Sequence, residues 1–302
     1  MATNIRRLGV LVALTAVMLL AVALLSLSYV EVGITDEIGS GGIILSAYDL
    51  SAVPQSVVDD ATRLAQELFG DSRDKYGDFA NQLLASYAEA EGKDFIVLFN
   101  SGGWGWNFPD SSPGWSSILT GINSELDKLG YESVMLNYRR TTETVRGVVK
   151  ESIEAATHYP SKARDLACRV DFLTAHNPDL KVIVTGESNG SVISDGVMAI
   201  LQDNPQVYSI QTGTPFWHKP VRRERALVLN SNGIVPDSFS DFDVPTMLWA
   251  SLKNLLGLST LDEEPGMILS YVRAPGHDYS WQYPQVSFQI SSFIVDNFGI
   301  KQ

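Results

Sequence analysis

Residues 180–200 read Leu-Lys-Val-Ile-Val-Thr-Gly-Glu-Ser-Asn-Gly-Ser-Val-Ile-Ser-Asp-Gly-Val-Met-Ala-Ile. A β-branched run at residues 182–184 precedes a Gly-rich corner at residues 186–190, and apolar residues at helical spacing follow it. The corner has the pattern G-x-S-x-G, in which a serine at a sharp strand-to-helix turn exposes its Oγ. We therefore identify Ser188 as the candidate nucleophile; an incidental serine in a βα turn is the alternative interpretation.

Extended runs and helical spacing alternate on both sides of this corner. Strands are predicted at residues 95–99, 133–138, 182–184, 207–211, 226–230 and 267–272, and helices at residues 118–129, 143–175 with a break near Pro160, 192–201, 244–256 and 286–298. Such alternation predicts βαβ units and an α/β fold with a doubly wound, mostly parallel sheet. Ligands in such sheets bind beyond the carboxyl ends of the strands, where the corner lies.

The 302 residues divide into three predicted parts. Residues 94–302 form the α/β domain. Residues 31–93 contain a glycine-rich linker or opening hairpin and two amphipathic helices, at residues 57–68 and 79–88, that are expected to pack on the domain. Residues 1–30 form an N-terminal membrane anchor or signal segment.

That N-terminal segment carries a long uncharged run. Residues 8–30 contain no charged side chain and follow Arg6 and Arg7. A helix of this length spans about 34 Å, enough to cross a hydrocarbon core of about 30 Å. The arginines favour a cytoplasmic N-terminus, so the domain is expected on the extracytoplasmic side of a membrane. The alternative is a cleaved signal peptide, for which Ser26 and Ser28 offer small residues, and a secreted domain.

Composition excludes some classes of function. With a net charge of −13, the chain lacks the excess of basic residues that nucleic-acid binding requires, so no nucleic-acid partner is expected. Cys168 is the single cysteine, which rules out an intrachain disulfide, and its place in a helical pattern indicates core packing. The four histidines show no metal-ligand spacing with one another or with Cys168, so neither a metal nor another cofactor is expected.

A serine nucleophile needs a base, and the base needs an orienting carboxylate. His277 lies after the predicted strand at residues 267–272 and before the final helix, where a loop can bring it over the corner. His218 is the less favoured histidine, with packing or surface exposure as its expected role. Asp237 is the first candidate for the acid and Asp241 the second, and a loop or turn-forming role is the alternative for both.

A glycine-rich segment follows the strand at residues 95–99. Backbone N–H groups of Gly102, Gly103 and Trp104 are predicted to form an oxyanion hole together with the N–H of Asn189. The tryptophans of this region, at positions 104, 106 and 115, either line an acyl or aromatic pocket, contact a membrane surface, or simply pack the loop.

Taken together, these motifs resemble the α/β-hydrolase superfamily. The resemblance covers roughly residues 94–300 and rests on Gly-Glu-Ser-Asn-Gly at 186–190, Ser-Gly-Gly-Trp-Gly at 101–105, Leu-Asn-Tyr-Arg-Arg at 136–140 and Gly-His at 276–277. It implies a Ser-acid-His hydrolase with Ser188 and His277 in the matching positions. This chain departs from the pattern of many members by having Asn232 and Gly233 where they have an aspartate.

The sequence thus favours a serine hydrolase that cleaves carboxylic esters or thioesters of a small-molecule or lipid-like acyl substrate. An acyltransferase using the same acyl-enzyme is a close variant, a peptidase is less favoured, and a non-catalytic binding domain is the alternative from another class. Residues 244–260 are expected to be a packing helix rather than a lid.

Overall fold

The computed structural model describes residues 52–70, 73–106, 111–141, 145–259, 266–268 and 272–301. The expected membrane anchor or signal segment at residues 8–30 lies outside these ranges, as does the linker up to residue 51. No helix within the described ranges combines the length and the apolar character needed to cross a bilayer.

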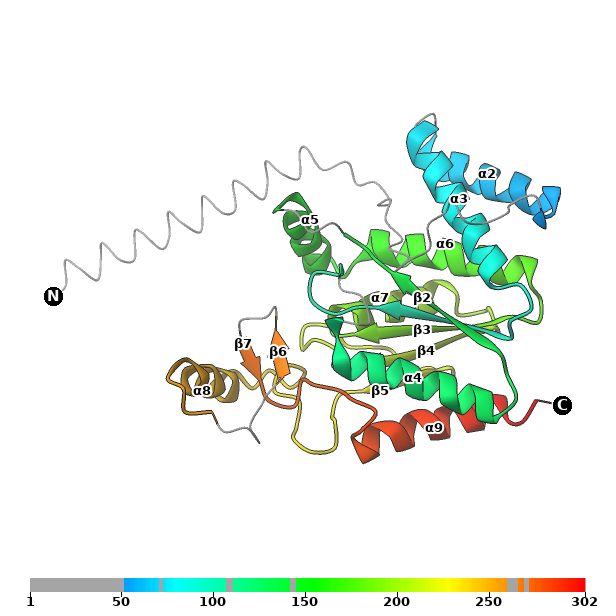
Figure 1. Ribbon diagram of the computed structural model, residues 1–302. Helices are drawn as coiled ribbons and strands as arrows, with labels where there is room; N and C mark the ends of the chain where they lie inside the picture. The colour runs from blue at the N-terminus through cyan, green and yellow to red at the C-terminus, as the bar shows by residue number, and fades with distance from the viewer. Residues whose placement is uncertain are drawn as a thin grey trace, which may run out of the picture.

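Within the described residues, five parallel strands form the central sheet and confirm the predicted α/β fold (Figure 1). They are β1 (Phe95–Asn100), β2 (Ser133–Tyr138), β3 (Lys181–Glu187), β4 (Val207–Thr212) and β5 (Ala226–Leu229). Their order in the sheet is β2-β1-β3-β4-β5. The chain therefore leaves β1 and β3 in opposite directions, which creates a topological switch point between the carboxyl ends of these two strands.

The sheet separates two apolar layers because side chains alternate along each strand. In β1, Ile96 and Leu98 belong to one core cluster, and Phe95, Val97 and Phe99 belong to the other. Figure 1 shows the helices on the two faces of the sheet. The first cluster includes residues of α2 (Gln55–Phe69), α3 (Arg73–Glu89), α6 (Pro160–His176) and α7 (Asn189–Ile200), and the second includes residues of α4 (Pro113–Lys128) and α9 (Pro284–Phe298). Residues of the two N-terminal helices thus pack against this layer of the core.

The helical region at residues 143–175 divides into α5 (Val145–Ala156) and α6. The break precedes Pro160, where His158 and Tyr159 have φ angles of 65° and 56°. Two left-handed residues cannot continue a right-handed helix, so the chain turns before α6 begins at the proline.

The described residues of the strand predicted at 267–272 do not join the central sheet. Two short strands, β6 (Gly266–Ile268) and β7 (Val272–Ala274), pair with each other in a separate antiparallel sheet. Met267 and Val272 are about half exposed, so this pair lacks the two covered faces that a parallel strand requires. The prediction of one strand in the main sheet was wrong because an apolar run does not indicate which sheet it joins.

The helix expected at residues 244–256 is present as α8 (Val244–Leu255), but it does little packing. Asp243 caps it by accepting a hydrogen bond from the Thr246 N–H at 3.2 Å. Met247 and Ala250 are its buried residues. Most of its large apolar side chains are exposed, contrary to the expectation of a packing helix.

Candidate active site

Ser188 lies in the sharp turn between β3 and α7 that the sequence pattern predicts. Its backbone has φ 49° and ψ −117°, a strained conformation for a residue with a side chain. A methyl group on Gly190 would lie 2.2 Å from the Asn100 carbonyl oxygen, and one on Gly186 would lie 2.6 Å from the Gly190 carbonyl oxygen. Both flanking positions therefore require glycine because backbone crosses backbone there.

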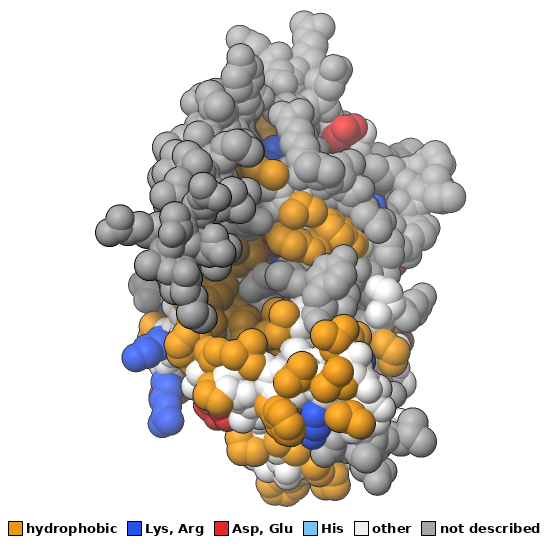
Figure 2. All heavy atoms as spheres, turned by 90° about the vertical axis from the view of Figure 1, so that its left-hand side faces the viewer, with side chains coloured by type: hydrophobic (Ala, Val, Ile, Leu, Met, Phe, Trp, Pro, Cys, Tyr) orange, Lys and Arg blue, Asp and Glu red, His pale blue; other side chains and the backbone are white. Residues whose placement is uncertain are grey.

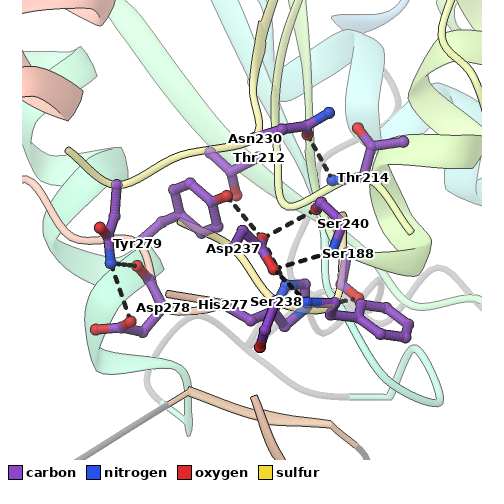
Figure 3. A network of polar contacts seen from close by, with 12 residues as sticks. Ser188, Thr212, Thr214, Asn230, Asp237, Ser238, Ser240, His277, Asp278 and Tyr279 are labelled. Atoms are coloured by element: carbon purple, nitrogen blue, oxygen red, sulfur yellow. Dashed lines mark hydrogen bonds and ion pairs between the residues drawn. The ribbon is translucent and has the colours of Figure 1, made fainter. Parts of the chain in front are cut away.

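The structure brings Ser188 together with His277 and Asp237 (Figure 3). The His277 Nε2 lies 3.1 Å from the Ser188 Oγ, and its Nδ1 lies 2.9 Å from the Asp237 Oδ2. The Asp237 side chain is fully buried, and the His277 side chain is 7% exposed. The three side chains come from loops after β3, β5 and β7, and they form one line from a buried carboxylate to the serine hydroxyl.

Asp237 is held ionised by a dense set of donors. Its Oδ1 accepts from the N–H groups of Phe239 and Ser240, and its Oδ2 accepts from the Ser240 Oγ and the Tyr279 hydroxyl. Burial alone would raise the pKa of this carboxyl, but the hydrogen bond and charge of His277, with the Ser240 and Tyr279 donors, outweigh it and lower the pKa.

The loops that carry the acid and the histidine are fastened to each other. The N–H and the Oγ of Ser238 both donate to the Pro275 carbonyl oxygen at 2.9 Å. Gly276 has φ 80°, and a methyl group there would lie 2.2 Å from the Pro236 carbonyl oxygen. These contacts align Asp237 with His277, although 40 residues separate them in the chain.

The structure separates the two candidate acids. Asp241, the second candidate, is exposed and donates its backbone N–H to the Asp237 carbonyl oxygen at 3.0 Å. Asn232, which replaces the aspartate of the resembling family, uses its Oδ1 to accept the N–H groups of Ile234 and Val235 and therefore shapes the loop. Of these side chains, the Asp237 carboxylate is the one within hydrogen-bond distance of His277.

The remaining histidines lie away from Ser188. The Nε2 of His218 lies 3.0 Å from the Asp195 Oδ2, and its Nδ1 lies 3.2 Å from the Nδ1 of His158. Cys168 is half-buried in α6, where burial raises the pKa of its thiol. No group of three or more His, Cys, Asp or Glu side chains in the described part of the chain is placed to hold a metal ion.

The predicted oxyanion-hole segment lies beside the nucleophile, but one of its donors is occupied. Asn189 is the first residue of α7, so its N–H is one of the orphan donors of the helix N-terminus. The Gly102 N–H instead donates to the Glu187 Oε2 at 3.1 Å. Gly102 is therefore not available to an oxyanion in this structure, and the prediction for this residue is not met.

Glu187 and Arg140 organise that segment, and neither role was predicted from the sequence. Glu187 also accepts from the Ser112 Oγ at 3.2 Å, and burial raises the pKa of its carboxyl. Arg140 is fully buried and donates to the carbonyl oxygens of Ser101 and Gly103 and to the Glu151 carboxylate. Because a trans peptide points its C=O and N–H in opposite directions, Arg140 turns the N–H groups of residues 102 and 104 away from itself.

The tryptophans of the glycine-rich region occupy different environments. Trp115 is buried in α4 and donates its Nε1–H to the Thr212 Oγ1 at 3.1 Å, so it belongs to the core. Trp104 and Trp106 are partly exposed, and their stacked rings lie 6.2 Å apart between centroids. These two rings are the members of the group that remain accessible from solvent.

Tyr279 is a further site residue that was not predicted from the sequence. Its hydroxyl donates to the Asp237 Oδ2 at 2.8 Å (Figure 3). No local pattern pointed to it, because residues 277–280 follow a turn and form no regular element, and the contact joins segments 42 residues apart in the chain.

Comparisons with known proteins add little to this geometry. No family model matches the chain, and no curated protein matches it. Among solved structures, the chain is similar to a Trichoderma reesei cutinase in complex with a C11Y4 phosphonate inhibitor. The two are 13% identical, the match covers 84% of this chain and 95% of the cutinase chain, and the TM-score is 0.38.

Proposed function

We propose that this protein is a serine hydrolase that cleaves carboxylic esters through an acyl-enzyme on Ser188. The observation that carries the proposal is the line of contacts Ser188–His277–Asp237, with distances of 3.1 Å and 2.9 Å. A strained serine, a histidine within reach of it and a buried carboxylate behind that histidine form the arrangement that activates a hydroxyl for acyl transfer.

The proton transfers follow from this arrangement. Asp237 is ionised and accepts the Nδ1–H of His277, which leaves the Nε2 lone pair facing the Ser188 hydroxyl. As the Ser188 Oγ attacks the acyl carbon, Nε2 takes the hydroxyl proton and then delivers it to the departing alcohol when the ester C–O bond breaks. Water repeats the sequence on the acyl-enzyme and releases the acid, and the buried Asp237 charge stabilises each imidazolium.

The developing oxyanion needs donors beside Ser188. We assign the N–H of Asn189 as the first, because it lies directly after the nucleophile at the start of α7. The N–H groups of Gly103 and Trp104 are the candidates for the second donor. Arg140 is a positioning residue for these groups, since it holds the Gly103 carbonyl oxygen at 3.0 Å.

The two alternative functions differ from a hydrolase in different ways: an acyltransferase differs in what happens to the acyl-enzyme, and in a non-catalytic domain no acyl-enzyme forms. An acyltransferase passes the acyl group to an alcohol other than water, and analysis of products in the presence of added alcohols separates it from a hydrolase. The aspartate missing at Asn232 is the observation that favours a non-catalytic domain. The Asp237 carboxylate, 2.9 Å from His277, favours the catalytic proposal.

Covalent labelling with a fluorophosphonate probe tests the proposal. Wild-type protein should be labelled, Ser188→Ala should not, and His277→Ala should react far more slowly. His218→Ala is a matched control because His218 also faces a carboxylate, that of Asp195 at 3.0 Å, and its labelling should equal that of the wild type. Failure of the folded wild type to react would favour the non-catalytic alternative.

We also propose that residues 8–30 anchor the protein in a membrane with the domain on the extracytoplasmic side. The support is the uncharged run after Arg6 and Arg7. Secretion after signal cleavage is the alternative. The mass of the mature protein and its recovery from membranes or from the medium distinguish the two.

A further inference from the structure

The surface of α8 presents apolar side chains to solvent. Leu248, Trp249, Leu252 and Leu255 of the helix, and Leu256 and Leu258 just after it, are between 44% and 81% exposed. We call these six residues the α8 apolar face. Figure 2 views the side of the molecule on which α8 lies and shows apolar side chains gathered there. Monomeric proteins rarely expose a large contiguous apolar patch, so this exposed surface calls for a partner.

The helix is fastened to the domain through its other side. At 100° per residue, Met247 and Ala250 project away from Leu248 and Leu252, and Met247 and Ala250 are the buried residues. The Ser251 Oγ accepts the N–H of Arg273 in β7 at 3.0 Å. The orientation of α8 is therefore fixed by contacts with β7, and those contacts leave the apolar face outward.

Aromatic rings connect the start of α8 with the active site. Phe242 is 56% exposed and directly precedes the Asp243 cap of α8. Its ring centroid lies 4.1 Å from that of Phe216, and Phe216 lies 5.8 Å from Phe239. Phe239 in turn lies 4.9 Å from the His277 ring. A chain of aromatic contacts thus leads from the start of α8 to the base that faces Ser188.

The chemistry of the chain favours a lipid bilayer as the partner of this face. Residues 8–30 form an uncharged run long enough to span a bilayer, and residues 31–51 reach at most about 70 Å. Such a tether keeps the domain at high local concentration near the lipid, so a shallow contact suffices to hold it there. The net charge of −13 opposes association with a second copy of the chain and with anionic lipid.

We propose that the α8 apolar face inserts into the headgroup and upper acyl region of an electrically neutral, phosphatidylcholine-type bilayer. The exposed Trp249 suits that interface, since its ring is apolar and its N–H can face the headgroups. The proposal rests on the proposed function of Ser188 and names its substrate class: water-insoluble acyl esters that reside in a bilayer. They reach Ser188 from the lipid along Phe242, Phe216 and Phe239.

Single-cysteine labelling of the full chain in phosphatidylcholine vesicles tests the docking. In a Cys168→Ser background, an environment-sensitive NBD fluorophore is placed on Leu252→Cys or, as a matched control, on Phe288→Cys, an α9 position that is 71% exposed. The probe at 252 should shift to the blue and lose at least half of its emission to acyl-chain doxyl lipid, and the probe at 288 should do neither. A probe at 252 that reports an aqueous environment would overturn the proposal. A probe at 252 that reports an apolar environment but is not quenched by doxyl lipid would also overturn it, and would indicate that a second copy or another segment of the chain covers the α8 apolar face.

Activity measurements separate this inference from the proposed function. Leu248→Ser/Leu252→Ser should reduce hydrolysis of a vesicle-embedded ester at least fivefold while leaving fluorophosphonate labelling and short soluble ester turnover unchanged. Phe288→Ser/Val295→Ser, which removes exposed apolar groups from α9, should change neither. Absence of labelling in the wild type overturns the function of Ser188 even if the probe at 252 contacts lipid. If labelling is normal, the docking inference alone is overturned by either of two results for Leu248→Ser/Leu252→Ser: equal losses of hydrolysis on the vesicle-embedded and the soluble ester, or no loss on either ester.

Discussion

The Tyr279 hydroxyl donates a 2.8 Å hydrogen bond to the Asp237 Oδ2, the same oxygen that lies 2.9 Å from the His277 Nδ1. Burial and the neighbouring Asp237 charge raise the pKa of Tyr279, so its hydroxyl keeps its proton at neutral pH and donates to the carboxylate. Tyr279 and His277 therefore share one carboxylate oxygen, and the tyrosine hydroxyl helps to fix its position. Tyr279 acts as a positioning residue for His277 through Asp237.

Removal of this hydroxyl should affect both stability and turnover. Tyr279→Phe deletes a hydrogen bond to a buried charge, which costs about 1.5–3 kcal/mol of unfolding free energy. Turnover of a soluble ester should fall roughly threefold to tenfold, since the carboxylate keeps its other donors but loses one constraint. Urea unfolding and steady-state kinetics measure the two effects. The control is Tyr283→Phe, whose hydroxyl donates to Asp278 instead, and this variant should keep wild-type turnover.

The identity of the acid predicts a contrast between two aspartates. Asp237→Asn should reduce kcat by about 10³-fold to 10⁴-fold, because an amide disrupts the histidine tautomer and cannot stabilise the imidazolium. Asp241→Asn should stay within about twofold of wild type, as the loss of an exposed charge away from the site costs little. Steady-state hydrolysis of a p-nitrophenyl ester gives both values. Equal activity of the two variants would refute the assignment of Asp237.

Arg140 should prove necessary for the geometry of the glycine-rich segment. A lysine retains the charge but cannot reach the Ser101 carbonyl, the Gly103 carbonyl and Glu151 at once. Arg140→Lys should therefore lower kcat at least about tenfold, with a smaller effect on KM, because an oxyanion donor is misplaced. It should also lose about 3 kcal/mol of unfolding free energy, since a buried pair is weakened.

A second buried arginine supplies the control for that variant. Arg169 pairs with Asp165 at 3.0 Å and lies away from the glycine-rich segment, over the Phe79 ring. Arg169→Lys should reduce the unfolding free energy without changing the kcat of the folded protein. If Arg140→Lys likewise affected stability alone, its positioning role would be disproved.

Glu187 should make stability depend on pH. Its pKa is raised by burial, so between an unfolded value of about 4.3 and the higher folded value the folded state binds more protons. The contribution of Glu187 to the free energy of unfolding is therefore fully present below about pH 4. It is lost as the pH rises through the folded-state pKa. Glu187→Gln removes that dependence, so the unfolding free energy of the variant relative to wild type should increase from pH 4 to pH 7.5. Urea unfolding at several pH values checks this, and a constant difference would contradict it.

Much of the fold was predictable because its signals are local. The strand–corner–helix pattern around Ser188 depends on residues within about ten positions, and glycine at 186 and 190 is required by backbone contacts inside that unit. The alternation of strands and helices likewise follows from hydrophobic period, so the parallel sheet and its helical layers agree with the sequence. The motif order also placed His277 near Ser188, and the structure brings the two within 3.1 Å.

Tertiary structure decided what depends on contacts between distant segments. The choice between Asp237 and Asp241 follows from the Ser238–Pro275 hydrogen bonds and the close approach at Gly276, which join loops about 40 residues apart. The occupation of the Gly102 N–H by Glu187 and the role of Arg140 depend on contacts across neighbouring strand ends. The exposure of the α8 apolar face could not be predicted from the sequence either. The hydrophobic period indicates which residues share a side of a helix, but not whether another layer covers that side. Side-chain direction is set by local backbone geometry, whereas partners are set by the packing of the whole domain.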